Sequence, residues 1–569
     1  DPTSYAFVKD KTLYIPTIFC SYGGETLDKK TPLLRSMKLL DTQSIRILRL
    51  FGNTQAQHVT AQVGPEQEYF LIDKEMYRRR EDLVLCGRTL FGARPPKGQE
   101  LDDHYYGAIK ARVAEFMHEL DQELWKVGVP AKTEHNEVAP AQHEVAQVYS
   151  DANSTCDHNQ LTMEFMKRVA LRHGLVCLLH EKPFAGVNGS GKHNNWSLST
   201  AEGMNLLEPG KEPYKNTRFL LFLTAIIKAV DEYQDLLRIS VASAGNDHRL
   251  GANEAPPAIV SVFLGTELTA ILEAIAAGKT YDSTPVTYMK VSDDTIPALV
   301  KDNTDRNRTS PFAFTGNKFE FRMPGSMFSI SGPNIVLNTI VAEELEEFAD
   351  KLENTADIEK AVYELVRETY LAHKRIVFNG NGYTDEWVQE AEKRGLLNLK
   401  STPAALPHLA DAKNIALFEK HNIFTAAEVK SRVEILLENY CTVLKIEAAT
   451  MLEMLHKDIL PAINAYASDL TSAALDKKAA GISVGFEAKL AAKLSAYGSE
   501  IYTAAEKLEA ALTAAADITS SKEAANFYHD SVLSAMEELR TAADQAEALL
   551  GEKYLPYPTY GELLFGVND

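Results

Sequence analysis

The 569-residue chain carries 59 basic and 79 acidic residues, a formal net charge of −20, and 45% of its residues are hydrophobic. This acidity argues against a nucleic-acid-binding protein, while the length and apolar content suffice for a large core. No segment reaches the ~20 apolar residues that a membrane span needs, and the five cysteines show no CxxC spacing. We therefore expect a cytoplasmic protein without a disulfide framework or a zinc site.

The first segment, residues 1–62, contains an apolar stretch at 12–19 that predicts a strand. The chain begins with Asp1 and has no initiator methionine. We expect this segment to be the remnant of a β-rich N-terminal region whose earlier part is missing.

The next strand is predicted at 63–70, where Glu66 and Glu68 fall on one face and Gln67 and Tyr69 on the other. Carboxylates held side by side repel and raise one another's pKa unless a cation neutralises them. A solvated surface position is the better interpretation for any single glutamate, but unpaired charges are costly among the apolar neighbours of this pair.

Three later segments add ligand-type side chains, at 137–144, at 188–193 and at 319–322. Five carboxylates and one imidazole suit Mg²⁺ or Mn²⁺, and two such ions ~3.5–4 Å apart can clamp a transferring phosphate. The sequence therefore predicts a site for two or more metal ions. Its six candidate ligands are Glu66, Glu68, Glu137, Glu144, His193 and Glu320.

Short strands and amphipathic helices alternate from residue 63 to about 340. Helices are expected at 102–127, with Gly128 as the stop, at 157–173 and at 217–238. An inserted segment at about 266–305 predicts a helix followed by a loop. From 341 to 569 the pattern is helix after helix, which we expect to build oligomer contacts. The expected divisions are therefore 1–62, a catalytic core at 63–340 and a helical region at 341–569.

Taken in order, these motifs resemble those of the glutamine synthetase family. The match rests on the segments 64–70, 137–144, 188–193, 249–256, 307–308 and 318–322, and so covers roughly residues 60–325. The length, the loop at 252–257, the insertion and the helical C-terminal region resemble the large bacterial type III branch.

The resemblance implies an α+β fold, with a curved antiparallel sheet flanked by helices and a long helical C-terminal region. It implies ATP-dependent ligation of ammonium to L-glutamate through a γ-glutamyl phosphate, giving glutamine, ADP and phosphate. It also implies a large homo-oligomer of stacked rings, with a dodecamer as the expected size.

The resemblance also assigns roles to residues. Glu68, Glu137 and Glu144 would hold one metal ion, and Glu66, His193 and Glu320 the other. Glu254 would shield the acyl phosphate from water and help to form the ammonium site. The substrate-binding residues would be Asn188, Gly189, Arg249 and Arg322, the ATP-binding residues Asn195, Ser197, Arg308 and Lys318, and the catalytic residues Glu254, Arg322 and Arg308. Glycines at 189 and 191 would let the backbone approach a ligand closely.

Two positions depart from the family pattern: Asn195 stands where a second histidine is common, and Ala313 where a second arginine is common. We therefore expect different nucleotide contacts. Two alternatives remain open at this point. A γ-glutamylamine ligase would use a polyamine or methylamine, and a non-catalytic structural or regulatory relative would be expected to have lost ligands that this chain retains.

Overall fold

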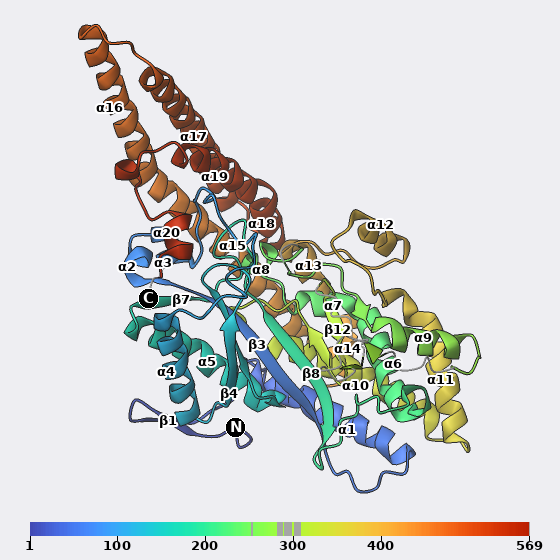
Figure 1. Ribbon diagram of the computed structural model, residues 1–569. Coiled ribbons are helices and arrows are strands. Elements are labelled where there is room, and N and C mark those ends of the chain that lie inside the picture. The colour runs from blue at the N-terminus through green and yellow to red at the C-terminus, as the bar shows by residue number, and fades with distance from the viewer. Residues whose placement is uncertain (252–253, 282–287, 290–298, 301–308, 568–569) are drawn as a thin grey trace.

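The computed structural model describes residues 1–251, 254–281, 288–289, 299–300 and 309–567. A mixed sheet with flanking helices forms one part of the molecule, and a set of long helices near the C-terminus extends away from it (Figure 1). This arrangement confirms the predicted fold class. None of the helices in the described ranges is long and apolar enough to cross a bilayer.

The central sheet contains nine strands among the described residues. Seven follow the order β4-β5-β3-β8-β13-β12-β9, and β6 and β7 also pair with β3. The sheet is mixed rather than wholly antiparallel, because β12 and β9 pair in parallel. The strands are β3 (Val59–Asp73), β4 (Ala131–Asn136), β5 (Gln142–Gln147), β6 (Ser150–Asp151), β7 (Leu175–Leu178), β8 (Lys192–Thr200), β9 (Val262–Phe263), β12 (Phe312–Phe314) and β13 (Phe319–Phe321).

Strand β3 runs through the middle of the sheet, and its side chains alternate between the two faces as predicted. Val59, Ala61 and Val63 are buried in the main core, and Tyr69 and Leu71 are buried in a second core cluster. These residues share one face of β3, so the helices that cover them lie on the same side. The opposite face carries Glu66 and Glu68 and is left for the site.

Helices on the covered face come from distant parts of the chain. The main core is built by α1 (Lys30–Leu50), α6 (Thr217–Glu232) and α10 (Ser331–Leu352), and the second cluster by α4 (Ala111–Lys126) and α5 (Ala152–Arg172). Asp151 and Asn216 fix the starts of α5 and α6, because each side chain accepts a hydrogen bond from a backbone N–H of the first turn. Ile340, at the expected end of the catalytic core, lies in the middle of α10, and the division into domains stays a prediction.

The C-terminal region contains α15 (Ala426–Met454), α16 (Leu460–Ala479), α17 (Phe486–Ala516), α18 (Ser521–Phe527) and α19 (Leu533–Glu547). Helices α16 and α17 form the long hairpin at the top of Figure 1. The chain then returns to the sheet, where the short helix α20 (Tyr560–Phe565) contacts β3.

Two predicted elements are shorter in the structure. The helix expected at 102–127 begins only at Ala111, since Asp102 has a left-handed φ of 51° and Lys110 an extended ψ of 145°. The strand expected at 12–19 is limited to β2 (Thr12–Tyr14), paired with β1 (Phe7–Lys9). It ends before Pro16, which has no N–H for a sheet hydrogen bond.

Other predicted elements are confirmed. Gly128 follows the end of α4 with a φ of 82°. The helices expected at 157–173 and 217–238 correspond to α5 and to α6 with α7 (Gln234–Ile239). The helix of the inserted segment is α9 (Gly265–Ala276), and most of the loop expected after it lies outside the described residues. Two short strands of that segment, β10 (Tyr288–Met289) and β11 (Leu299–Val300), pair with each other.

Candidate active site

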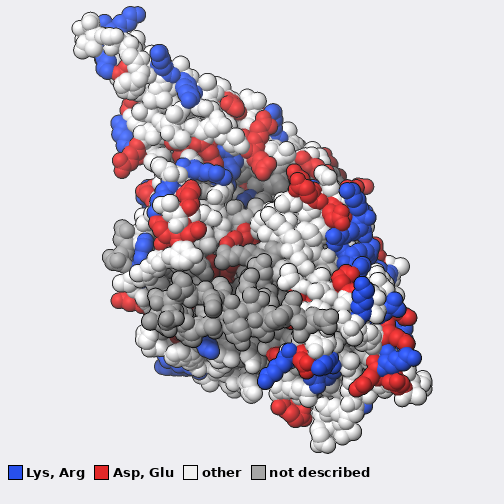
Figure 2. All heavy atoms as spheres, turned by 45° about the vertical axis from the view of Figure 1, so that its right-hand side comes forward, with Lys and Arg blue, Asp and Glu red and all other residues white. Residues whose placement is uncertain are grey.

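A cleft of about 550 Å³ lies on the face of the sheet opposite the helices, and all six candidate metal ligands line it. Figure 2 shows acidic side chains gathered in a hollow at the centre of one face, while elsewhere on that face basic and acidic groups are interspersed. Strand register explains the convergence. Glu66 pairs with His193, and Glu68 pairs with Glu144, across neighbouring antiparallel strands.

His193 lies at the centre of the first group of ligands. Its Nδ1 is 3.0 Å from Glu66 Oε2 and 3.0 Å from Glu320 Oε1, and its Nε2 is 3.9 Å from Glu68 Oε1. One ligand atom each from Glu66, His193 and Glu320 can lie within 4.8 Å of the others, the spacing of a candidate metal site. The three residues that the resemblance assigns to one metal ion therefore lie together, and their role as its ligands stays a prediction.

The second group contains a residue that the sequence analysis missed. His135 Nε2 is 2.9 Å from Glu137 Oε1 and 3.6 Å from Glu144 Oε1, and these three residues form the other candidate set. Glu68 lies between the two groups, and its Oε2 accepts a hydrogen bond of 2.6 Å from Gly191 N. The signal for His135 was its position two residues before Glu137, on the same side of an extended chain.

Arg322 and Asn195 support the first group. Arg322 Nε is 3.0 Å from Glu320 Oε1, and Asn195 Nδ2 donates to Glu66 Oε1 at 2.9 Å and to Gly64 O at 3.0 Å. Arg322, Asn195 and Lys318 all line the cleft, as does Ala313. His193 and Asn195 share the cleft face of β8, whereas Trp196 and Leu198 point into the core on the other face.

Glu254 reaches the cleft from a loop with a left-handed backbone, at φ 68°. Its Oε2 accepts a hydrogen bond of 3.2 Å from Asn188 Nδ2. A non-glycine residue in this conformation costs of order 1 kcal/mol or more, so the surrounding structure must hold it. Glu254 and Asn188, which the sequence placed in one site, are therefore in direct contact.

Arg249 and Ser197 are not among the described residues that line the cleft. Arg249, 3% exposed, donates to the carbonyls of Arg322 and Met323 at 3.1 and 3.2 Å. Ser197 Oγ donates to Asn205 Oδ1 at 3.0 Å and to Asn317 O at 2.8 Å. Arg308 lies outside the described residues.

The glycines of the 188–193 segment serve close packing of protein groups. A Cβ at 189 would lie 2.3 Å from Glu181 O, and a Cβ at 191 would lie 2.0 Å from Arg249 Nη2. The groups that approach these glycines in the structure are the Glu181 carbonyl and the Arg249 guanidinium, and the approach of a ligand to this backbone stays a prediction.

The pKa values of the carboxylates in the cleft are shifted in opposite directions. Burial, together with the charges of Glu66 and Glu68, raises the pKa of Glu144 well above its ordinary value, and burial raises the pKa of Glu68. Burial would also raise the pKa of Glu66, but hydrogen bonding and attraction to His193 outweigh it and lower that pKa. The cluster thus needs positive charge, which protons or a divalent cation can supply.

Comparison with known proteins gives the family. A model of the glutamine synthetase catalytic domain matches residues 46–260, the glutamine synthetase C-terminal domain matches 361–478, and the N-terminal domain of type III glutamine synthetase matches 1–36. A glutamine synthetase of Butyrivibrio fibrisolvens is 52% identical over 99% of this chain and 81% of its own length. The chain belongs to the glutamine synthetase family.

Two further relatives agree with the type III branch. The type-3 glutamine synthetase of Dictyostelium discoideum is 45% identical, and the glutamine synthetase of Bacteroides fragilis is 43% identical. Each comparison covers 99% of this chain and 79% of the relative. Glutamine synthetases use ATP and divalent metals, and the two carboxylate and histidine groups of the cleft fit such ions by donor type and spacing.

Proposed function

We propose that this chain catalyses the ATP-dependent ligation of ammonium to L-glutamate, with a γ-glutamyl phosphate as the intermediate and glutamine, ADP and phosphate as products. The observation that carries the proposal is the convergence of six ligand side chains from four separate segments in one cleft of a glutamine synthetase family member. The family relatives named above are themselves named glutamine synthetases.

Two divalent ions, Mg²⁺ or Mn²⁺, would be held by the two groups of ligands. Glu66, His193 and Glu320 would hold one ion, and Glu137 and Glu144, with Glu68 from the strand between them, would hold the other. His135 is within reach of the second group. When bound, such ions neutralise phosphate oxygens, so that a carboxylate can attack the terminal phosphate of ATP.

The chain's own cations would complete the phosphate site. Arg322 is held against Glu320 beside the cleft, and Lys318 also lines it, so both can face a transferring phosphoryl group. We assign Arg308 to the same task on the family resemblance. Asn195 would contact the nucleotide, and the hydroxyl of Ser197 would support the neighbouring backbone.

Glutamate would be bound beside the segment that contains Asn188 and Gly189. Asn188 offers an amide group next to Glu254, and Arg249 adds permanent positive charge behind the segment. Arg249 would thus act on the substrate carboxylate at short range through its charge. Glu254 would exclude water from the acyl phosphate and take a proton as ammonium becomes the nucleophile.

Assembly and location follow from other observations. Tyr5, Ile15, Phe19 and Leu27 are each more than 60% exposed, which supports a subunit interface at the N-terminal segment. We propose a large ring-shaped homo-oligomer with a dodecamer as its size, to be measured by light scattering. All five cysteines are free, which supports a reducing cytoplasm.

The experiment that tests the choice of substrate compares amines. The purified chain is given ATP, Mg²⁺ and glutamate with ammonium, methylamine or putrescine, and the amide product is identified by mass spectrometry. We expect kcat/KM to be highest for ammonium. A higher value for methylamine or putrescine would identify a γ-glutamylamine ligase, and no product with any amine would support a non-catalytic relative.

A further inference from the structure

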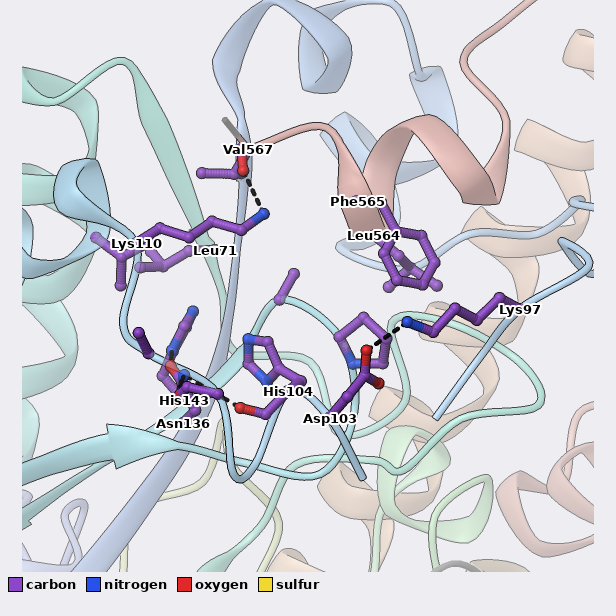
Figure 3. Close-up of a pocket in the computed structure, with 15 residues that line it drawn as sticks. Leu71, Lys97, Asp103, His104, Lys110, Asn136, His143, Leu564, Phe565 and Val567 are labelled. Carbon is purple, nitrogen blue, oxygen red and sulfur yellow. Dashed lines mark hydrogen bonds and ion pairs between the residues drawn. The ribbon is translucent and has the colours of Figure 1, made fainter. Parts of the chain in front are cut away.

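A second cavity, of about 200 Å³, lies on the other face of the hairpin that carries the metal ligands. Asn136 and His143 line this cavity, whereas His135, Glu137 and Glu144 line the active-site cleft, so successive residues of the hairpin serve the two spaces in turn. Among the described residues the two spaces share no lining side chain. Figure 3 shows the cavity between residues 97–110, the hairpin and the end of the chain.

The cavity has a positive mouth and apolar walls. Lys97 and Lys110 reach it from opposite sides, and Asp103, which pairs with Lys97, is the single acidic side chain among its described lining residues. The walls include Leu71, Val113, Leu564, Phe565 and Val567. One excess positive charge above an apolar floor suits an organic anion with a short hydrocarbon part.

The C-terminal residues that close the cavity are firmly anchored. Tyr560 is 1% exposed, its ring packs edge-on against Phe184 at 5.4 Å, and its hydroxyl accepts hydrogen bonds from Ala185 N at 3.1 Å and Arg540 Nη2 at 2.6 Å. Lys110 Nζ donates to the carbonyl of Val567. The cavity is therefore formed before any ligand enters, which reduces the ordering cost of binding.

The wall at 97–110 also touches the active site. Gln99 and Asn188 exchange two hydrogen bonds of 2.7 Å, one from Gln99 Nε2 to Asn188 Oδ1 and one from Asn188 N to Gln99 Oε1. His104 Nδ1 donates to Glu137 O at 2.7 Å, and Tyr105 lines the cleft itself. A group bound at Lys97 thus contacts a segment that is hydrogen-bonded both to Asn188, beside the proposed glutamate site, and to the backbone of the candidate metal ligand Glu137.

We propose that this cavity is a regulatory site for a small aliphatic carboxylate, whose charged end binds between Lys97 and Lys110 and whose chain packs against Leu71 and Leu564. The volume of the cavity is about that of seven water molecules in the liquid, which suits a ligand of roughly six to nine non-hydrogen atoms. The bound anion ties residues 97–110 to the end of the chain, in the arrangement in which Gln99 holds Asn188. Binding therefore raises the affinity of the enzyme for glutamate, an effect that rests on the proposed function.

Binding is tested by titration calorimetry of the full chain with 4-methylpentanoate. We expect a dissociation constant of about 1 mM or tighter. The alcohol 4-methylpentan-1-ol has the same chain without the charge, and inorganic phosphate has charge without the chain, so each should bind at least about tenfold more weakly. No heat with 4-methylpentanoate, or equal binding of either control, would overturn the proposal in favour of a water-filled cavity or a general anion site.

Matched lysine variants locate the site. Lys97→Met and Lys110→Met should each weaken the binding of 4-methylpentanoate at least about tenfold, because each removes one of the two charges that face the carboxylate. Lys126→Met is the control, since Lys126 is likewise an exposed lysine paired with one carboxylate, Glu123, but lies outside the cavity. Unchanged thermal unfolding shows that the variants are folded. Wild-type binding by both cavity variants would place the ligand elsewhere.

The regulatory effect has its own readout. Saturating 4-methylpentanoate should lower the KM for glutamate. In calorimetry, glutamate should lower the dissociation constant of 4-methylpentanoate by the same factor by which 4-methylpentanoate lowers that of glutamate. If 4-methylpentanoate binds but glutamate does not change its affinity, the proposed regulatory role of the cavity is wrong. Because calorimetry does not need turnover, absence of glutamine formation would count against the proposed function and leave the test of the cavity intact.

Discussion

Glu68 faces Glu144 directly across the ladder between β3 and β5. Like charges at opposed positions of an antiparallel pair destabilise a sheet, and here both side chains are also largely shielded from water. The site is therefore built at a cost to the metal-free protein, which bound cations offset. Removal of one of the two carboxylates should consequently have opposite effects on stability with and without metal.

Glu68→Gln tests this relationship. We expect Mn²⁺ affinity to fall roughly 100-fold or more and phosphoryl transfer to be lost, because the amide supplies no negative charge to the ion. The metal-free variant should unfold at the same or a higher denaturant concentration than the wild type, since the repulsion is gone. Calorimetry with Mn²⁺ and denaturant titrations measure the two effects. Glu75→Gln, an exposed glutamate paired with Arg78, is the control, and near-normal turnover of Glu68→Gln would remove this residue from the site.

Glu254→Ala separates the two chemical steps. The variant should retain more of the glutamate-dependent transfer of phosphate from ATP than of the capture of ammonia, because Glu254 contacts Asn188 of the substrate segment and is proposed to act on ammonium rather than on ATP. The ratio of glutamine to ADP formed should therefore fall. Quenched-flow measurement of both products gives this ratio, with the exposed Glu267→Ala on α9 as control. Equal loss of both steps contradicts the role of the loop.

Gly191→Ala should disturb the support of the glutamate site. The new Cβ would lie 2.0 Å from Arg249 Nη2, so the guanidinium must move and lose its hydrogen bonds to the carbonyls of residues 322–324. We expect the KM for glutamate to rise at least about tenfold, a loss of about 1.4 kcal/mol in binding. Steady-state kinetics with glutamate and with ATP varied separately give the two KM values.

Gly498→Ala provides the matched control for that substitution. Its Cβ would meet nothing nearer than Ile463 Cγ2 at 3.7 Å, within helix α17. Alanine is favoured over glycine in a helix by about 1 kcal/mol, so the variant should be slightly more stable with unchanged kinetics. Wild-type kinetics in Gly191→Ala would show that Arg249 does not depend on the close approach.

The sequence predicted the part of the site that depends on local alternation. The alternation of side chains along a strand placed Glu66 and Glu68 on one face, and in the structure both carboxylates line the cleft. Residues 102–110 were wrongly assigned to a helix, because the apolar spacing of α4 continues back to Ile109 while the backbone does not. For this reason Tyr105 was not predicted to line the cleft.

Long-range contacts were beyond the reach of local patterns. The docking of α20 against Phe184 joins residues about 375 positions apart, and no periodicity in either segment indicates the partner. The same holds for Arg249, whose hydrogen-bond acceptors are backbone carbonyls of a distant strand end. Carbonyl groups carry no signature in the sequence, so its position could not be predicted.

Glu547 should make stability depend on pH. Burial raises the pKa of its carboxyl from 4.5 to about 7. A group whose pKa is higher in the folded state stabilises the fold most below its unfolded pKa, and this contribution is lost as the pH rises through about 7. The loss amounts to about 3 kcal/mol between pH 4.5 and 8.

Glu547→Gln should therefore gain stability relative to the wild type at pH 8 and gain little at pH 5. Denaturant midpoints at both pH values give the difference, with the exposed Glu552→Gln as control. The same difference at pH 5 and pH 8 would show that the carboxyl of Glu547 titrates normally.

Phosphate release from ATP by the purified chain with Mg²⁺ and glutamate, measured with and without ammonium, tests the proposed ligase most directly. We expect steady release, with stoichiometric glutamine, only when glutamate, ammonium and Mg²⁺ are all present, and loss of that release in Glu68→Gln. Release that is independent of glutamate, or that is unchanged in Glu68→Gln, would contradict a two-metal glutamate–ammonia ligase at this cleft.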